Sequence, residues 1–83
     1  MAQILVVDDE KKMGIIIEGT LKDAGYSVKT VTSGEEALKL LKKNTYDVVI
    51  TDLKMEPVDG MAVLKKAKEL NESTEVIMMT AYA

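Results

Sequence analysis

The stretch YDVVITDLKMEPVDGM, residues 46–61, decides the fold of the surrounding chain. It holds a short β-branched run, VVI at residues 48–50, whose polar flanks are typical of a parallel strand buried on both faces. We therefore expect a strand over residues 47–51, followed by Asp52 and a turn that contains Pro57. In an open parallel sheet, ligands bind beyond the carboxyl ends of the strands, so Asp52 is expected at a ligand site. An aspartate that only starts a turn would give the same local pattern.

The segments on either side of this strand alternate between strand and helix patterns. Apolar runs at residues 3–7 and 75–79 predict two more buried strands, and weak alternation at residues 27–31 predicts a more exposed one. Helical periodicity lies between the strands, at residues 11 to about 24, at 34 to about 43, and in a segment that begins after Asp59. The resulting order, βαβαβαβ, predicts one α/β domain with a parallel sheet.

Each predicted helix carries its apolar residues on one side, which we expect to face the sheet. These residues are Met13, Ile16, Ile17, Thr20, Leu21 and Ala24 in the first helix, Ala37, Leu38 and Leu41 in the second, and Met61, Leu64, Ala67 and Leu70 in the third. Ser33 and Glu36 form the pattern of a capping box, and Asp59 is a helix cap of the same kind. Gly14 and Gly19 each weaken the first helix by about 1 kcal/mol relative to alanine.

The composition excludes several classes of function. The chain has 83 residues, a net charge of −3 and neither cysteine nor histidine. Thiol chemistry, thiolate metal sites and histidine general bases are therefore absent, and any metal would be held by oxygen, which favours Mg²⁺, Ca²⁺ or Mn²⁺. The chain has no basic patch of the kind that binds nucleic acid and no apolar run long enough to span a membrane. We therefore expect a cytoplasmic protein. With no Phe or Trp, the core is expected to be aliphatic, with the tyrosines Tyr26, Tyr46 and Tyr82 at its margins.

Polar side chains follow three of the predicted strands. Asp8 and Asp9 end the first strand, Asp52 ends the third and Thr80 ends the fourth. Because parallel strands end at the same edge of a sheet, neighbouring strands would bring these groups together. Like charges in such a cluster repel one another, and a hard divalent cation such as Mg²⁺ is the natural compensation. A carboxylate beside it could itself be a nucleophile for a phosphoryl group.

Three stretches, QILVVDDE, VVITDLKMEPVDGM and VIMMTAYA, resemble the signature segments of response-regulator receiver domains of two-component signalling. Within them, DLKM and MTAYA are most similar to receivers of sigma-54-dependent activators. The resemblance implies a flavodoxin-like doubly wound sheet with strand order 2-1-3-4 over residues 1–83. It also implies that a histidine kinase or phosphotransfer protein phosphorylates Asp52.

The resemblance carries further site residues with it. It implies that Mg²⁺ is bound by Asp8, Asp9, Asp52 and the backbone carbonyl of Lys54, and that Thr80 is a switch hydroxyl. Lys54 and Tyr82 occupy positions whose side chains tune dephosphorylation and partner contact in such domains. The chain departs from the family pattern at Glu56, because the proline that usually follows the methionine comes one residue later, at Pro57.

A second departure is that the chain stops after the fourth strand, whereas a receiver continues through a helix, a strand with a lysine, and another helix. We therefore expect an incomplete receiver whose fourth strand has a free edge and whose Met13 and Ile16 lose cover. Such a chain is expected to form a homodimer through that edge or by exchange of elements, or to be the ordered part of a longer chain. An alternative is a fragment that acts only as a folding or oligomerisation module. A metal-dependent hydrolase is less favoured, because no spare acid or base is evident, and we do not expect a turnover enzyme.

Overall fold

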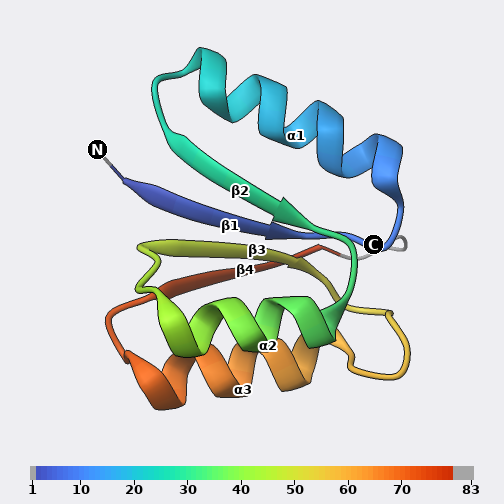
Figure 1. Ribbon diagram of the computed structural model, residues 1–83, viewed down its shortest axis with the longest axis vertical. Coiled ribbons are helices and arrows are strands. Elements are labelled where there is room, and N and C mark those ends of the chain that lie inside the picture. The colour runs from blue at the N-terminus through green and yellow to red at the C-terminus, as the bar shows by residue number, and fades with distance from the viewer. Residues whose placement is uncertain (1, 80–83) are drawn as a thin grey trace.

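The protein is a parallel four-stranded sheet flanked by three helices in a computed structural model that describes residues 2–79. The strands lie in the order β2-β1-β3-β4, which confirms the predicted topology. The elements are β1 (Gln3–Val7), α1 (Lys11–Asp23), β2 (Ser27–Val31), α2 (Gly34–Lys43), β3 (Val48–Asp52), α3 (Gly60–Leu70) and β4 (Glu75–Met79). Figure 1 shows α1 on one face of the sheet and α2 and α3 side by side on the other.

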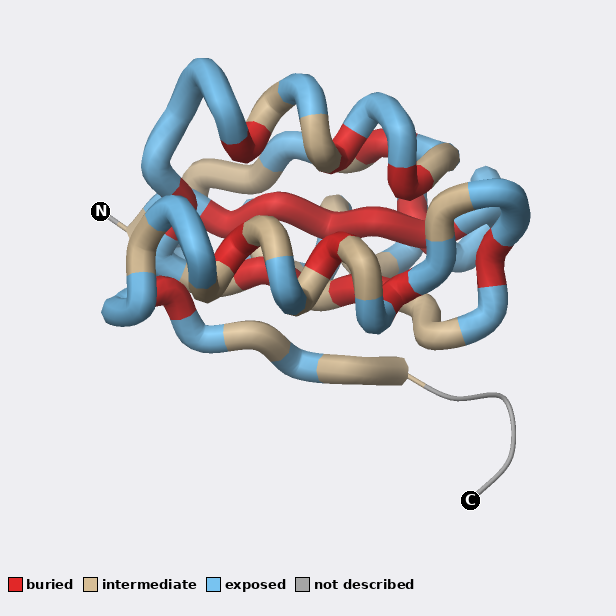
Figure 2. Tube along the Cα trace, turned by 90° about the horizontal axis from the view of Figure 1, so that it is seen from below, coloured by how far each residue is buried: buried red, intermediate tan, exposed pale blue. Residues whose placement is uncertain are grey.

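The main core lies between the sheet and the pair α2 and α3. The strands contribute fully buried residues to it, among them Leu5, Val7 and Val49, and the helices contribute small or branched residues that allow close approach. The buried helix residues are Ala37, Leu41, Val63 and Ala67. Figure 2 shows that β1 is buried along most of its length, as expected for an internal strand that has a helix layer on each side.

Tyr46 also belongs to this core, which corrects the prediction that all three tyrosines lie at its margins. It is only 7% exposed, whereas Tyr26 is exposed. The buried hydroxyl of Thr74 donates a hydrogen bond of 2.7 Å to the Tyr46 carbonyl oxygen, which ties the start of β3 to the start of β4. Burial raises the pKa of the Tyr46 phenol. Tyr82 lies outside the described residues.

The predicted caps of α2 and α3 are confirmed. The Ser33 hydroxyl accepts a hydrogen bond from the Glu36 amide at 3.2 Å, and the Glu36 carboxylate accepts one in return from the Ser33 hydroxyl at 3.3 Å. Asp59 accepts a hydrogen bond from the Ala62 amide at 3.0 Å. Each cap satisfies an amide that has no partner within its helix, so both helices begin where these side chains direct them.

Two predictions about α3 and β3 are corrected. The strand β3 spans Val48–Asp52, one residue later than expected, although the Asp47 amide still donates a hydrogen bond to the Gln3 carbonyl. The buried side of α3 carries Gly60, Val63 and Ala67, while Met61 and Leu70 are exposed. The helix is rotated because Gly60 packs directly against the backbone at Asp52 and Leu53, where a Cβ atom would collide.

The predicted sheet-facing side of α1 is also wrong in part. Gly14 is buried next to Thr30, and Ile17 and Leu21 are half-buried, whereas Thr20 and Ala24 are exposed. Met13 and Ile16 are exposed together with Ile15, which agrees with the expectation that Met13 and Ile16 lose cover. Val48 and Ile50 of β3 are likewise half-buried rather than buried on both faces. The reason is that α1 lies over β1 and β2, so the described helices cover only part of this face of the sheet (Figure 1).

Candidate functional site

Asp8 and Asp9 follow the buried strand β1 directly. Asp8 is only 5% exposed, its amide donates a hydrogen bond to the Val31 carbonyl at 3.1 Å, and its carboxylate accepts one from the Glu10 amide at 2.9 Å. Asp9 is exposed. The two neighbouring carboxylates therefore differ, because one is fixed by the backbone and the other can reach solvent.

Asp52 is the last residue of β3 and lies opposite Met79 of β4 in the sheet register. The backbone around it is held from two sides. The Leu53 amide donates to the Met79 carbonyl at 2.9 Å, and the Gly60 amide donates to the Leu53 carbonyl at the same distance. The Asp52 side chain, which is half-buried, thus projects from a rigid strand end next to the first turn of α3.

The strand ends bring the three aspartates together, as the topology predicted. One carboxylate oxygen from each of Asp8, Asp9 and Asp52 lies within 4.8 Å of the other two. Burial raises the pKa of Asp52, and the charges of Asp8 and Asp9 raise it further, while hydrogen bonds from the Lys54 and Leu53 amides act in the opposite direction. An all-oxygen set of repelling carboxylates is the chemistry that Mg²⁺ neutralises, so the donor set fits this ion.

A cleft of about 610 Å³ opens beside this cluster. It shares Asp9 with the cluster and is otherwise formed by the loop between β3 and α3. Its lining residues are Asp9, Leu53, Lys54, Met55, Glu56 and Asp59. The sequence had suggested only that Glu56 alters the path of this loop. The position of Glu56 in the cleft depends on how the loop folds back on α3. No local sequence pattern predicts that path.

Thr80 and Lys54 are the two remaining residues of the predicted site. Thr80 lies outside the described residues, directly after the last residue of β4 in the sequence. Lys54 is exposed and lines the cleft, and the role of its backbone carbonyl as a metal ligand stays a prediction.

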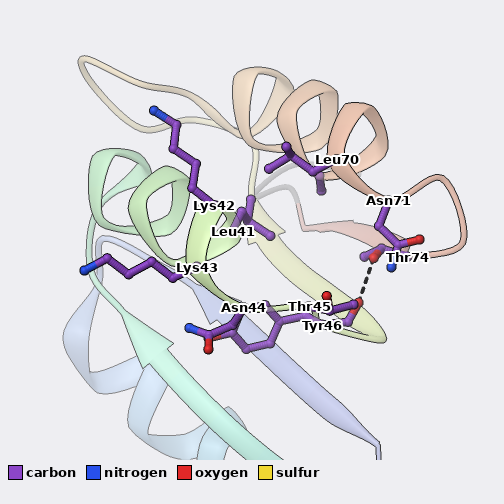
Figure 3. Close-up of a pocket in the computed structure, with 10 residues that line it drawn as sticks. Leu41, Lys42, Lys43, Asn44, Thr45, Tyr46, Leu70, Asn71 and Thr74 are labelled. Atoms are coloured by element: carbon purple, nitrogen blue, oxygen red, sulfur yellow. Dashed lines mark hydrogen bonds between the residues drawn. The ribbon is translucent and has the colours of Figure 1, made fainter.

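A second hollow, of about 190 Å³, lies at the opposite edge of the sheet (Figure 3). It lies between the ends of α2 and α3, and the residues around it include Leu41, Tyr46, Leu70 and Thr74. Because the strands are parallel, their amino ends and carboxyl ends lie at opposite edges. None of the predicted site residues lines this hollow, so it is separate from the aspartate cluster.

Comparison with known proteins identifies the class of protein. The response regulator receiver domain family matches residues 4–83, and the chain belongs to this family. The chain is 40% identical over 80 residues to the transcriptional regulatory protein ZraR of Escherichia coli K12, a match that covers 96% of this chain and 18% of ZraR. It is also 35% identical to sporulation initiation phosphotransferase F of Bacillus subtilis, over 96% of this chain and 64% of that protein.

Solved structures agree with this assignment. The response regulator TrrA from Thermotoga maritima, in complex with Mg²⁺ and BeF, superposes with a TM-score of 0.92 at 36% identity, over all of this chain and 72% of TrrA. TrrA has also been solved in complex with the histidine kinase ThkA. The chain thus spans about a fifth of the length of ZraR and about two thirds of these receivers. Within the part that the structure describes, no helix is long and apolar enough to cross a membrane.

Proposed function

We propose that this chain accepts a phosphoryl group on Asp52 from a histidine kinase or phosphotransfer protein. The observation that carries the proposal is the approach of the Asp8, Asp9 and Asp52 carboxylates to within 4.8 Å at the carboxyl ends of β1 and β3. These three carboxylates and the backbone carbonyl of Lys54 would hold the Mg²⁺ ion. The Mg²⁺ and BeF complex of the related TrrA, and its complex with a kinase, support the choice of ion and partner.

The side chain of Asp52 is suited to nucleophilic attack. Its carboxylate is partly removed from water, which raises its pKa and makes the oxygen more basic. In the transfer, an Asp52 oxygen forms a bond to phosphorus as the bond from phosphorus to the donor histidine nitrogen breaks. The leaving imidazole keeps the electron pair. When bound, Mg²⁺ supplies neutralisation of the charge on the transferring group.

Thr80 completes the proposal as the switch hydroxyl, which donates a hydrogen bond to a phosphoryl oxygen. It follows β4 in the sequence, and β4 is hydrogen-bonded to the backbone beside Asp52 through the Leu53 amide and the Met79 carbonyl. The support for this role is the resemblance of VIMMTAYA to the third receiver stretch. A Thr80→Ala variant should still accept phosphate but should lose the change in partner affinity that follows it.

The test is phosphorylation of the purified chain by acetyl phosphate with Mg²⁺, followed by intact-mass measurement. The wild-type chain should gain one phosphoryl group, and Asp52→Asn should gain none. Asp9→Asn should require more Mg²⁺ for the same extent of phosphorylation, because one ligand is lost. Beryllofluoride with Mg²⁺ gives an independent binding readout. The proposal would be excluded if the wild-type chain neither gained a phosphoryl group nor bound beryllofluoride. It would also be excluded if Asp52→Asn were phosphorylated like the wild type.

A second candidate function is an assembly module without efficient phosphotransfer, and the outer edge of β4 favours it. Among the described residues β4 pairs only with β3, and Ile77 on this strand is 53% exposed. An unpaired strand edge with apolar side chains invites pairing with a second copy. Light scattering coupled to size exclusion should then show a homodimer that Ile77→Lys converts to a monomer. A monomer at all concentrations would exclude self-association. Neither of the two proposed functions includes turnover of small phosphoesters.

A further inference from the structure

The cleft beside the aspartate cluster is predominantly acidic. Three of its lining residues carry carboxylates, Asp9, Glu56 and Asp59, and Lys54 is its one lysine. Because Asp9 belongs both to this cleft and to the aspartate cluster, the cleft lies next to the group that we propose to accept phosphate. The field in this cleft therefore acts on any charged molecule that approaches Asp52 along it.

The three carboxylates differ in what else they do. Asp9 is part of the aspartate cluster, and Asp59 accepts the capping hydrogen bond from the Ala62 amide. Glu56 is exposed and makes no hydrogen bond or ion pair with any other described residue. Among the described residues no structural contact therefore depends on the Glu56 carboxylate, and its charge can be removed without loss of such a contact.

We propose that Glu56 determines phosphodonor specificity by repelling small dianionic donors from the cleft. The inference rests on the proposed phosphoacceptor role of Asp52. Acetyl phosphate, a dianion, should feel this repulsion about twice as strongly as phosphoramidate, which carries a single net negative charge at neutral pH. Glu56 acts on the approach of the donor and not on the bond that forms, so it is a specificity residue and not a catalytic one.

The reaction affected is a simple transfer. An Asp52 carboxylate oxygen bonds to phosphorus while the bond between phosphorus and the acetate oxygen breaks, and acetate leaves with the electron pair. No oxidant or further reactant is needed. For phosphoramidate the leaving group is ammonia, which departs with its proton already in place.

The size of the effect follows from Coulomb's law in water. A single charge acting on a dianion several ångströms away changes the donor's local concentration by about twofold to fivefold at low ionic strength. The effect should fall towards unity in about 1 M salt, where the screening length is about 3 Å. It should appear in the apparent affinity for the donor, while the rate at saturating donor stays unchanged.

The experiment compares wild type, Glu56→Gln, Glu56→Asp and Glu72→Gln, with saturating Mg²⁺ determined for each variant by calorimetry. Glu72 is the matched control, because it is an exposed glutamate in the loop before β4, at the opposite edge of the sheet. At low salt Glu56→Gln should be phosphorylated about twofold to fivefold faster by subsaturating acetyl phosphate, with a smaller gain for phosphoramidate. Glu56→Asp, which keeps the charge, and Glu72→Gln should both behave as wild type.

Three results would overturn the inference while leaving the phosphoacceptor role intact. These are an unchanged or slower Glu56→Gln with acetyl phosphate, an equal gain for both donors, and a Glu56→Asp variant that behaves like Glu56→Gln. If wild type and all variants failed to gain phosphate from either donor, the proposed function itself would fall, and the specificity inference with it.

Discussion

The ionised carboxylate of Asp52 lowers the stability of the fold. Its pKa is raised by burial and by Asp8 and Asp9, so the folded chain holds the proton more tightly than the unfolded chain does. Ionising Asp52 therefore costs folding free energy at neutral pH, and that cost disappears as the pH falls below the unfolded value of 3.8. Asp52→Asn should stabilise the metal-free chain by up to about 1 kcal/mol at pH 7 and by less near pH 4.

Urea unfolding at the two pH values measures this difference. A loss of stability in Asp52→Asn at pH 7, or a gain that does not shrink towards pH 4, would contradict the expected linkage. Glu72→Gln provides the comparison for removing a carboxylate that lies outside the cluster, and its effect should be close to zero.

The pKa of Glu18 is shifted in the opposite direction, so its ionised form stabilises the fold. Its carboxylate accepts a hydrogen bond of 2.6 Å from the Thr30 hydroxyl and one of 3.0 Å from the Lys22 ammonium, and the first of these contributes most to lowering its pKa. The stabilisation is present above the unfolded value of 4.5 and is lost as the pH falls through the lowered pKa. Glu18→Gln should cost about 0.5 kcal/mol at pH 7, because the group is partly exposed, and almost nothing near pH 3. Denaturant titrations at both pH values check this, and an equal cost at both would refute it.

At the scale of elements, α1 carries two glycines whose surroundings differ. A Cβ atom at Gly19 meets nothing within 4 Å, whereas one at Gly14 lies 2.9 Å from the Thr30 methyl group. Gly19→Ala should therefore stabilise the protein by about 1 kcal/mol through helix propensity alone. Gly14→Ala should gain less or lose stability, because Thr30 must move and its hydroxyl holds Glu18. Thermal unfolding of the two variants checks this, and equal gains would show that α1 is free to shift on the sheet.

The elements themselves could be predicted from local sequence, but their rotation could not. The strand limits, apart from those of β3, and the caps at Ser33 and Asp59 follow from nearest neighbours, because backbone amides need partners close in the chain. Which side of α1 and α3 meets the sheet depends instead on close backbone contacts. Gly60 lies against the backbone at Asp52 and Leu53, and Gly14 lies against the Thr30 side chain, so both helices make a close approach to the sheet at a glycine.

At the scale of the whole molecule, bound Mg²⁺ should stabilise the fold because only the folded chain assembles the three carboxylates. At ten times its dissociation constant it should contribute about 1.4 kcal/mol, which raises the unfolding temperature of a domain this small by several degrees. Asp9→Asn should lose most of that shift, because Asp9 is exposed and its replacement barely disturbs the fold. Calorimetric scans with Mg²⁺ and with K⁺ at equal ionic strength check this, and equal shifts for both ions would argue against a specific site.

The aspartate cluster was predictable because strand order alone brings Asp8, Asp9 and Asp52 to one edge of the sheet. The role of Glu56 was not, because its loop joins β3 to α3 by a path that the alternation of strands and helices does not specify. Position on a regular element is thus readable from sequence, whereas the composition of a cleft between loops has to be seen.

The placement of Asp8 on β1 has one further consequence. That strand lies between β2 and β3, has four fully or nearly fully buried residues, and continues its hydrogen bonding through the Asp8 amide to Val31. Amides in such a strand exchange with deuterium only when the entire domain opens. Asp8 is therefore held in place for as long as the native state lasts. Its amide should exchange at the rate of the slowest-exchanging amides of the chain.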